Sequence, residues 1–336
     1  MKAVGYIDSL AIDEARSLFD FETATPVPGP RDLLVRVEAI SVNPVDTKVR
    51  MRRQGTADAP VILGWDAAGV VEAVGAEVSL FRPGDAVFYA GDLNRPGSNA
   101  QFQIVDERIV GKKPASLSYP EAAALPLTAI TAWEGLFDRL QLPKHGAGKL
   151  LIVGAAGGVG SLAVQFARQL TDATVIGTAS RPESREWLEA LGAHAVIDHS
   201  RPLSEELASA GLGEVDYVFS LNATDRHWAA IVKAVRPQGR IALIDDPKSL
   251  DIIPLKPKSL SLHWEFMFTR SMFATPDMSA QHDLLTEVAQ LVDAGTVRTT
   301  LGANFGTIDS ANLKRAHAAL ESGRSIGKVV LEGWAD

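Results

Sequence analysis

The sequence predicts an α/β protein that combines a doubly wound parallel sheet with a separate, mostly β domain. Up to about residue 126, short stretches with the alternation of β-strands are separated by Pro and Gly. From residue 150 to residue 244, strands alternate instead with amphipathic helical stretches, which is typical of βαβ units. A chain of 336 residues is long enough for both domains.

The order of the predicted elements gives the domain boundaries. We expect strands of the first domain at 33–41, 67–74, 85–89 and 100–105. We expect parallel strands of the second domain at 150–153, 174–178, 195–197, 216–220 and 240–244, with a sixth within 260–268. Helical patterns at 278–294 and 310–322 and a strand at 326–331 close the chain. The predicted domains are therefore 1–126, 127–268 and 269–336, and the last segment is expected to return to the first domain.

Charge and cysteine content exclude several kinds of partner and site. Asp and Glu number 41 against 33 Lys and Arg, a formal net charge of −8, which argues against a nucleic acid or an anionic membrane as partner. There is no cysteine, so a disulfide, a thiolate nucleophile, an iron–sulfur cluster and a cysteine-bound zinc are all excluded. No apolar signal core follows Met1, and a cytoplasmic location is the default expectation.

A glycine-rich turn lies between the first parallel strand and its helix, in the run KLLIVGAAGGVG at 149–160. Gly157 and Gly158 allow a tight turn that approaches a pyrophosphate, and Gly160 allows the helix, expected from Ser161 to residue 170, to pack closely on the strand. The alternative is that these glycines serve packing alone. Because strand, turn, helix and the following βαβ rhythm all occur together, we expect a dinucleotide site.

The residues after the second parallel strand indicate which dinucleotide binds. Ser180 and Arg181 follow the strand at 174–178, and no acidic residue occurs before Glu183. An NAD-specific site has an acidic residue there that binds the adenosine ribose hydroxyls. Ser180 can donate to a 2′-phosphate, and Arg181 can pair with it through its planar guanidinium. The sequence therefore predicts NADPH; the alternative is an exposed loop arginine ahead of a helix that starts at Pro182.

Several motifs together resemble the medium-chain dehydrogenase/reductase family over essentially the full chain. They are SVNPVD at 41–46, GWDAAGVVEAVG at 64–75, PGD at 83–85, LPLTAITA at 125–132 and AAGGVG at 155–160, where Ala155 replaces the family's first glycine. KPKSL at 256–260 and WEFMF at 264–268 are similar to the zinc-free quinone oxidoreductase-like subgroup, often labelled zinc-type alcohol dehydrogenase-like. The resemblance implies a Rossmann domain joined to a GroES-like catalytic domain.

The same resemblance predicts that the metal site of the family's zinc enzymes is lost. The positions that match the ligands are Asn43, Trp65 and Leu127, and none of these is a competent primary zinc ligand. Val45 matches the hydroxyl residue that begins the proton relay, and the four-cysteine lobe is reduced to a loop at 92–101. We therefore expect no metal.

The resemblance also implies roles for individual residues, each with a structural alternative. Asn43 is expected beside the nicotinamide, or else in an Asn–Pro turn. Asp46 and Lys48 are expected near the cleft or as a solvated pair, and Thr131 at the carboxamide or inside a helix. Asp66 is a proton donor if buried, although a structural hydrogen bond is the safer interpretation. The substrate pocket is expected at Trp65, Met267 and Phe268, with core packing as the alternative.

The expected cofactor-binding set collects the glycine turn, the phosphate-binding pair and three further positions. It comprises Ala156, Gly157, Gly158, Val159, Gly160, Ser180, Arg181, His199, Asn222 and Lys328. The cofactor is expected at the carboxyl edge of the parallel sheet, in the cleft facing the β domain.

The expected function is that of an NADPH-dependent reductase that transfers a hydride to a quinone or to an activated alkene or carbonyl, in a homodimer of the kind common in the family. Two alternatives stay open: an alcohol or aldehyde dehydrogenase that uses zinc in an altered way, and a non-catalytic NADPH-binding sensor.

Overall fold

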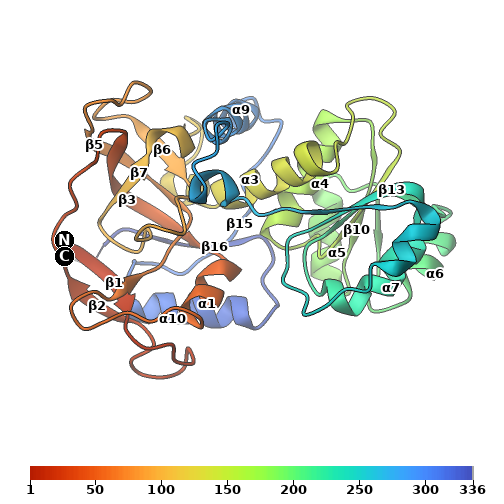
Figure 1. Ribbon diagram of the computed structural model, residues 1–336, viewed down its shortest axis with the longest axis horizontal. Coiled ribbons are helices and arrows are strands. Elements are labelled where there is room, and N and C mark those ends of the chain that lie inside the picture. Colours follow the sequence, from red (N-terminus) through yellow and green to blue (C-terminus); the bar gives the residue numbers. More distant parts are fainter. Residues whose placement is uncertain (335–336) are drawn as a thin grey trace. The chain divides into compact units, whose positions relative to one another are not determined.

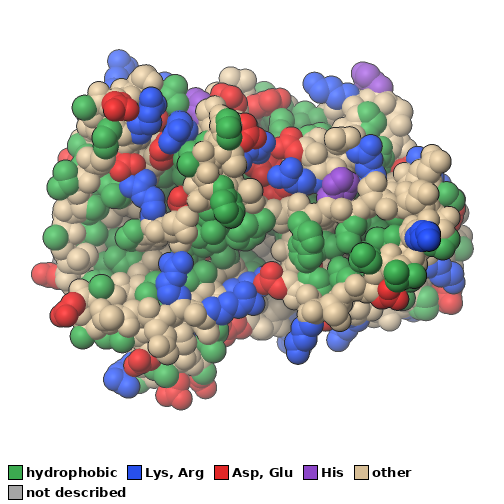
Figure 2. Space-filling view, in the orientation of Figure 1, with side chains coloured by type: hydrophobic (Ala, Val, Ile, Leu, Met, Phe, Trp, Pro, Cys, Tyr) green, Lys and Arg blue, Asp and Glu red, His purple; other side chains and the backbone are tan. Residues whose placement is uncertain are grey.

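The computed structural model describes residues 1–334 of the chain, and they form two compact units (Figure 1). The first unit joins residues 1–127 to the segment that begins at 268, and the second unit comprises residues 128–267. Within residues 1–334, no helix is both long and apolar enough to cross a membrane. Lys and Arg side chains are interspersed with Asp and Glu over the face shown in Figure 2.

The first unit is built on a long central strand, β3 (Asp32–Val42), whose sequence DLLVRVEAISV places most of its side chains in the core. It pairs antiparallel with β5 (Ala67–Val74), β7 (Phe102–Asp106) and β16 (Lys328–Glu332). The strand order is β15–β16–β3–β5–β6–β8, with β7 added beside β3. The outer strands are β6 (Ala86–Tyr89), β8 (Val110–Lys112) and β15 (Leu301–Asn304). A smaller sheet has the order β2–β1–β4 and contains β1 (Lys2–Tyr6), β2 (Phe19–Glu22) and β4 (Val61–Ile62).

Pairing of β16 with β3 joins the end of the chain to the first unit, with Val330 opposite Ser41. The helices of this unit include α1 (Pro44–Arg50), α2 (Tyr119–Ala123), α9 (Ala280–Asp293) and α10 (Ser310–Glu321). The helices expected at 278–294 and 310–322 are confirmed to within two residues at each end.

The second unit has a six-stranded parallel sheet in the order β11–β10–β9–β12–β13–β14. The strands are β9 (Lys149–Val153), β10 (Thr174–Thr178), β11 (Ala195–Ile197), β12 (Val215–Ser220), β13 (Val235–Leu243) and β14 (Ser261–Trp264). The order runs outward from β9 in both directions, which is the doubly wound topology. The predicted fold class is thereby confirmed.

Helices cover both faces of this sheet (Figure 1). They are α4 (Gly158–Leu170), α5 (Pro182–Ala190), α6 (Leu203–Ser209) and α7 (Thr224–Ala234). Apolar side chains of α7, among them Trp228 and Ile231, share one core with strand residues such as Leu151 and Val218. Burial of this apolar surface is the main force that holds the helices on the sheet.

Three differences from the sequence-based expectation stand out in the second unit. Helix α4 begins at Gly158, three residues before Ser161, because Gly157 is its N-cap and the glycines enter the first turn. Strand β13 begins at Val235, where Val215 of β12 pairs with it ahead of a register shift. The third difference is a π-helix at Glu134–Arg139 that continues α3 (Pro126–Trp133) and that no sequence pattern indicated.

Candidate active site

The glycine turn of the second unit leaves its backbone open. A Cβ atom added at Gly157 would meet only the carbonyl oxygen of Gly154, 3.8 Å away. A Cβ at Gly160 would lie 2.3 Å from the carbonyl oxygen of Ala155, so a side chain there would force α4 away from the turn. Ala156 and Val159 are half-buried. The turn and the amide groups at the start of α4 thus fit a pyrophosphate group.

The other predicted cofactor residues of this unit follow neighbouring strands. Ser180 is exposed and Arg181 half-buried just after β10, and α5 begins at Pro182 as expected. His199 follows β11, and Asn222 follows β12, where its Cβ lies 3.3 Å from the position of a Cβ at Gly154. Because carboxyl ends of parallel strands share one edge of a sheet, these residues occupy the edge at which doubly wound folds bind ligands.

In the first unit, four polar side chains form a buried cluster: Asn43, Asp46, Asp66 and Lys328 are each at most 3% exposed. The Nδ2 of Asn43 donates to Oδ2 of Asp66 at 2.9 Å, and Nζ of Lys328 donates to the same oxygen at 3.0 Å. Lys328 also donates to Oδ1 of Asn43 and, at 3.1 Å, to the carbonyl oxygen of Val42. We call these four residues the Asn43–Lys328 cluster.

Two carboxylates of this cluster accept backbone hydrogen bonds as well. Asp46 accepts from the amide of Asn43 at 2.6 Å and from that of Gly64 at 3.1 Å, while Asp66 accepts from the amide of Leu127 at 2.7 Å. Burial raises the pKa of Asp46 to about 7, against the lowering effect of those hydrogen bonds. Burial also raises the pKa of Asp66, and the neighbouring ammonium of Lys328 opposes that rise.

These contacts bear on several residues predicted for the site. Asn43 is the N-cap of α1 ahead of Pro44 and forms a capping box with Asp46, and its amide hydrogens face Asp66 and, at 3.3 Å each, two backbone carbonyl oxygens. Asp46 is fully buried rather than solvated. The ammonium of Lys328 is enclosed by three oxygen acceptors within the first unit, and its expected role at the cofactor stays a prediction. Asp66 makes structural hydrogen bonds, as the safer of its two interpretations expected.

The residues predicted for the substrate pocket are in the core. Trp65 has no exposed surface; its indole N–H donates to the carbonyl oxygen of Asp92 at 3.2 Å, and its ring meets that of Phe268 edge-on with 6.4 Å between centroids. Met267 and Phe268 are also buried. This is the core packing expected as the alternative, so a substrate-facing role for the three stays a prediction. Lys48 is half-buried on α1 and Thr131 buried on α3, and their catalytic roles likewise stay predictions.

Zinc does not fit the donor set of this site. Within residues 1–334, no three His, Asp or Glu side chains are grouped so that they could hold a metal. At the three matching positions, the amide of Asn43 is fully engaged, the indole of Trp65 is a bound donor, and Leu127 offers only an isobutyl group. The positive charge inside the Asn43–Lys328 cluster comes instead from a lysine.

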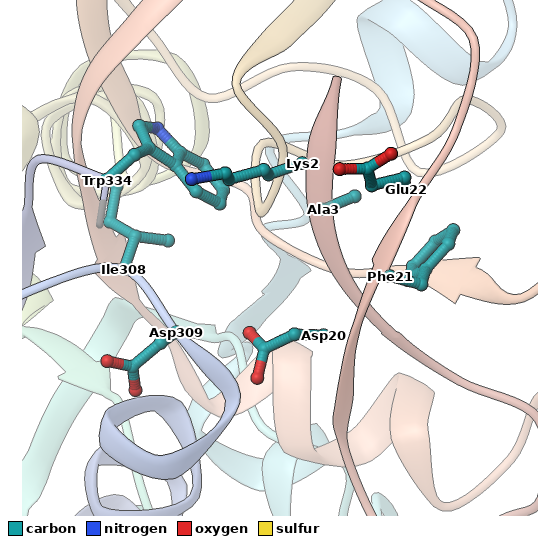
Figure 3. A pocket seen from close by; sticks show the side chains of 8 residues that line it. All are labelled: Lys2, Ala3, Asp20, Phe21, Glu22, Ile308, Asp309 and Trp334. Carbon is teal, nitrogen blue, oxygen red and sulfur yellow. The ribbon is translucent and has the colours of Figure 1, made fainter. Parts of the chain in front are cut away.

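A hollow of about 370 Å³ in the first unit carries none of the predicted site residues (Figure 3). Asp20 on β2 and Asp309 at the start of α10 are among the residues that line it. Both hold that helix in place: Asp20 accepts from the amide of Ser310 at 2.9 Å, and Asp309 caps the helix through the amide of Asn312 at 2.7 Å. We therefore assign this hollow a structural role.

A buried acidic pair in the second unit was not expected from the sequence. Glu265 follows β14 and is hydrogen-bonded to Glu134 of the π-helix, while Nε of Arg139 binds its Oε2 at 2.9 Å. Burial, and next the charge of Glu134, raise the pKa of Glu265 well above its usual range. The only signal available was one acidic residue inside the apolar run WEFMF at 264–268.

Comparison with known proteins adds family evidence to this geometry. Residues 29–115 match the family described as alcohol dehydrogenase GroES-like domain, and residues 191–331 match the one described as zinc-binding dehydrogenase. A zinc-type alcohol dehydrogenase-like protein of Staphylococcus aureus is 41% identical, over 98% of this chain and 99% of its own length. The 2-methylene-furan-3-one reductase of Solanum lycopersicum is 30% identical, over 98% of this chain and 79% of its own.

Solved structures agree with these relatives. The crystal structure of a putative zinc-dependent alcohol dehydrogenase protein from Rhizobium etli is 57% identical, with a TM-score of 0.97 over 100% of this chain and 99% of the other. A quinone oxidoreductase from Pseudomonas syringae is 27% identical, with a TM-score of 0.83 over 99% of each chain.

Proposed function

Because this chain belongs to the medium-chain dehydrogenase/reductase superfamily of oxidoreductases, we propose that it is an NADPH-dependent reductase that passes a hydride to a quinone, or to an activated alkene or carbonyl, without a catalytic metal.

The closed Asn43–Lys328 cluster is the observation that carries this proposal. A catalytic zinc needs three protein ligands and an open position at which it polarises a substrate oxygen. Here both amide hydrogens of Asn43 and the ammonium of Lys328 are already bound to oxygens of the chain. A substrate that accepts a hydride without such polarisation must itself be electron-poor, as quinones and enones are. Two similar proteins, named as a quinone oxidoreductase and a 2-methylene-furan-3-one reductase, support this substrate class.

The second unit supplies the residues that would hold the cofactor. A nicotinamide dinucleotide supplies the hydride chemistry in such reductases. The turn around Gly157 and Gly158 would bind its pyrophosphate, and Ser180 with Arg181 would bind its 2′-phosphate. The chain itself contributes position and the exclusion of water.

We expect the purified protein to oxidise NADPH steadily with 1,4-benzoquinone, phenanthrenequinone and but-3-en-2-one, but not with simple ketones. Because no metal takes part, EDTA should leave the rate unchanged, and elemental analysis after dialysis should find far less than one zinc per chain. The measurement is the decay of NADPH absorbance across this panel, with and without the chelator.

Two outcomes would replace this function by another. Roughly one zinc per chain, with activity lost to the chelator, would favour the altered zinc dehydrogenase. Tight NADPH binding with no turnover of any acceptor would favour the non-catalytic sensor.

We also propose that the chain is a homodimer, formed at the end of the parallel sheet. Strand β14 is the last strand of that sheet, and its outer edge pairs with no strand among residues 1–334. Next to that edge, Trp264 is 55% exposed and Phe266 is 46% exposed. An exposed strand edge with large apolar side chains is a surface that a second strand covers readily.

The variant Trp264→Lys should therefore shift the protein toward the monomer, because a charged side chain disfavours burial of that edge. Light scattering should give about twice the monomer mass for the wild type and a lower mass for the variant at equal concentration. Val27→Lys, at an exposed position in the first unit, is the matched control. A monomeric wild type would end the proposal, and a fully dimeric Trp264→Lys protein would place the interface elsewhere.

A further inference from the structure

A second hollow, of about 510 Å³, lies in the second unit at the start of α7 and is lined by Ala223, Asp225 and Arg226. Ala223 has a left-handed backbone conformation, φ 52°, which turns the chain sharply from the end of β12 into the helix. The hollow thus opens at the carboxyl edge of the sheet, where ligands of doubly wound folds bind.

Arg226 is the cation of this hollow. Its side chain is exposed, and within residues 1–334 its guanidinium has neither a hydrogen-bond nor an ion-pair partner. The nearest carboxylate on the same helix, that of Asp225, accepts from the backbone amide of Arg226 instead. Five N–H groups in a planar fork are thus available to an anion.

Two imidazoles stand beside Arg226. The rings of His199 and His227 meet edge-on with centroids 5.8 Å apart, and Nδ1 of His199 is buried without a partner in the part of the chain that the structure describes. Burial lowers the pKa of both rings, and the positive charge of Arg226 lowers it further. The carboxylate of Asp198 raises the pKa of His199, and that of Asp225 raises the pKa of His227. The charged side chains that act on the two rings are therefore Arg226, Asp198 and Asp225.

The hollow is connected to the predicted phosphate-binding pair through β10 and β11. Thr178 lies opposite Ile197 in the sheet, so Ser180 and His199, two residues beyond each, leave adjacent strands at the same edge. His199 contacts His227, the residue after Arg226. Ser180, Arg181 and His199 therefore follow adjacent strands at one edge of the sheet, and His199 in turn contacts the residue next to Arg226.

We propose that Arg226, together with the His199–His227 pair, is a second group that recognises a phosphomonoester at this edge, the 2′-phosphate of NADPH. The inference rests on the proposed NADPH dependence and adds to it a residue set that lies after a different strand from Arg181. Binding of the dianion favours the protonated imidazoles, so the preference for NADPH over NADH increases as the pH falls from about 8 to about 6.

The test is to titrate the full-length protein with NADPH, NADH, 2′,5′-ADP and 5′-AMP. Arg226→Gln should weaken binding of NADPH and of 2′,5′-ADP by about tenfold or more and leave NADH and 5′-AMP within about twofold, as expected for one charge-assisted bond. His227→Phe, which keeps a ring against His199, should flatten the pH dependence of the preference. Lys233→Gln removes an exposed charge from the same helix and should leave the binding of both NADPH and NADH unchanged.

The contrary results separate the inference about Arg226 from the proposed choice of NADPH. Unchanged binding of 2′,5′-ADP in Arg226→Gln overturns this inference, and so does an equal loss for NADPH and NADH. Tight binding of inorganic phosphate that does not compete with NADPH would assign the site to free phosphate and also overturns it. A wild type that binds NADPH and NADH equally overturns the proposed cofactor choice itself, before any variant is made.

Discussion

Replacing Arg181 by Glu is expected to remove most of the preference for NADPH over NADH. We expect the wild type to bind NADPH at least about tenfold more tightly, since one charge-assisted bond of about 1.5–3 kcal/mol corresponds to roughly 10- to 150-fold discrimination. Arg181 is the N-cap of α5 with an extended backbone, directly after β10, and no acidic residue in that loop binds ribose hydroxyls. Dissociation constants for the two cofactors, measured by fluorescence titration, give the ratio.

The rate with quinone at saturating cofactor should change little in Arg181→Glu, because the proposed contact is with the adenosine end of the cofactor, away from the nicotinamide. Arg181→Lys should keep part of the preference, since it retains the charge but loses the planar fork. Lys233→Glu, on exposed surface of α7, controls for the change of net charge. An unchanged ratio in Arg181→Glu would show that Arg181 does not contact the phosphate.

The strands that the sequence predicted best are those with a buried apolar run between clear turn signals. Strands β5, β10 and β11 match their predicted bounds. The missed strands include β2, β4, β8 and β15, which have two to four residues and lie at sheet edges. Such short segments carry too few residues for a period of two to appear, and pairing with a neighbouring strand decides their conformation.

Within the candidate site, the parts formed by residues close together in the sequence were predicted, and the part formed by distant residues was not. The glycine turn and the Ser180–Arg181 pair are local in sequence, and their geometry follows from the strand and helix beside them. The Asn43–Lys328 cluster is not local: Asp66 and Lys328 are 262 residues apart, and only the pairing of β16 with β3 brings them together. No motif near Asn43 or near Lys328 indicates that the ammonium of Lys328 donates a hydrogen bond to the side-chain oxygen of Asn43.

Replacing Lys328 by Met should lower the free energy of unfolding by about 3–5 kcal/mol, the cost of breaking a buried ion pair by removing one partner. The change leaves the carboxylate of Asp66 without its counter-charge and Oδ1 of Asn43 without a donor, both away from water. Urea unfolding near neutral pH measures the loss. Lys248→Met removes an exposed lysine and should change stability by less than about 0.5 kcal/mol.

The loss caused by Lys328→Met should depend on pH in a definite direction. The pKa of Asp66 is already raised in the folded chain, and removal of the ammonium raises it further. A carboxyl group that holds its proton more tightly when folded loses stability as the pH rises above its unfolded pKa of about 4, so the variant should be closest to the wild type at acid pH and furthest from it near pH 8.

A second substitution separates the ion pair from packing. Asp66→Asn in the Lys328→Met background removes the uncompensated charge, so the double variant should regain a large part of the lost stability and lose most of its pH dependence. A Lys328→Met protein as stable as the wild type at pH 8 would mean that Asp66 is solvated or neutral there and that the cluster is not a buried ion pair. If the double variant were no more stable than Lys328→Met, the lost contribution would belong to the packing of the lysine side chain instead.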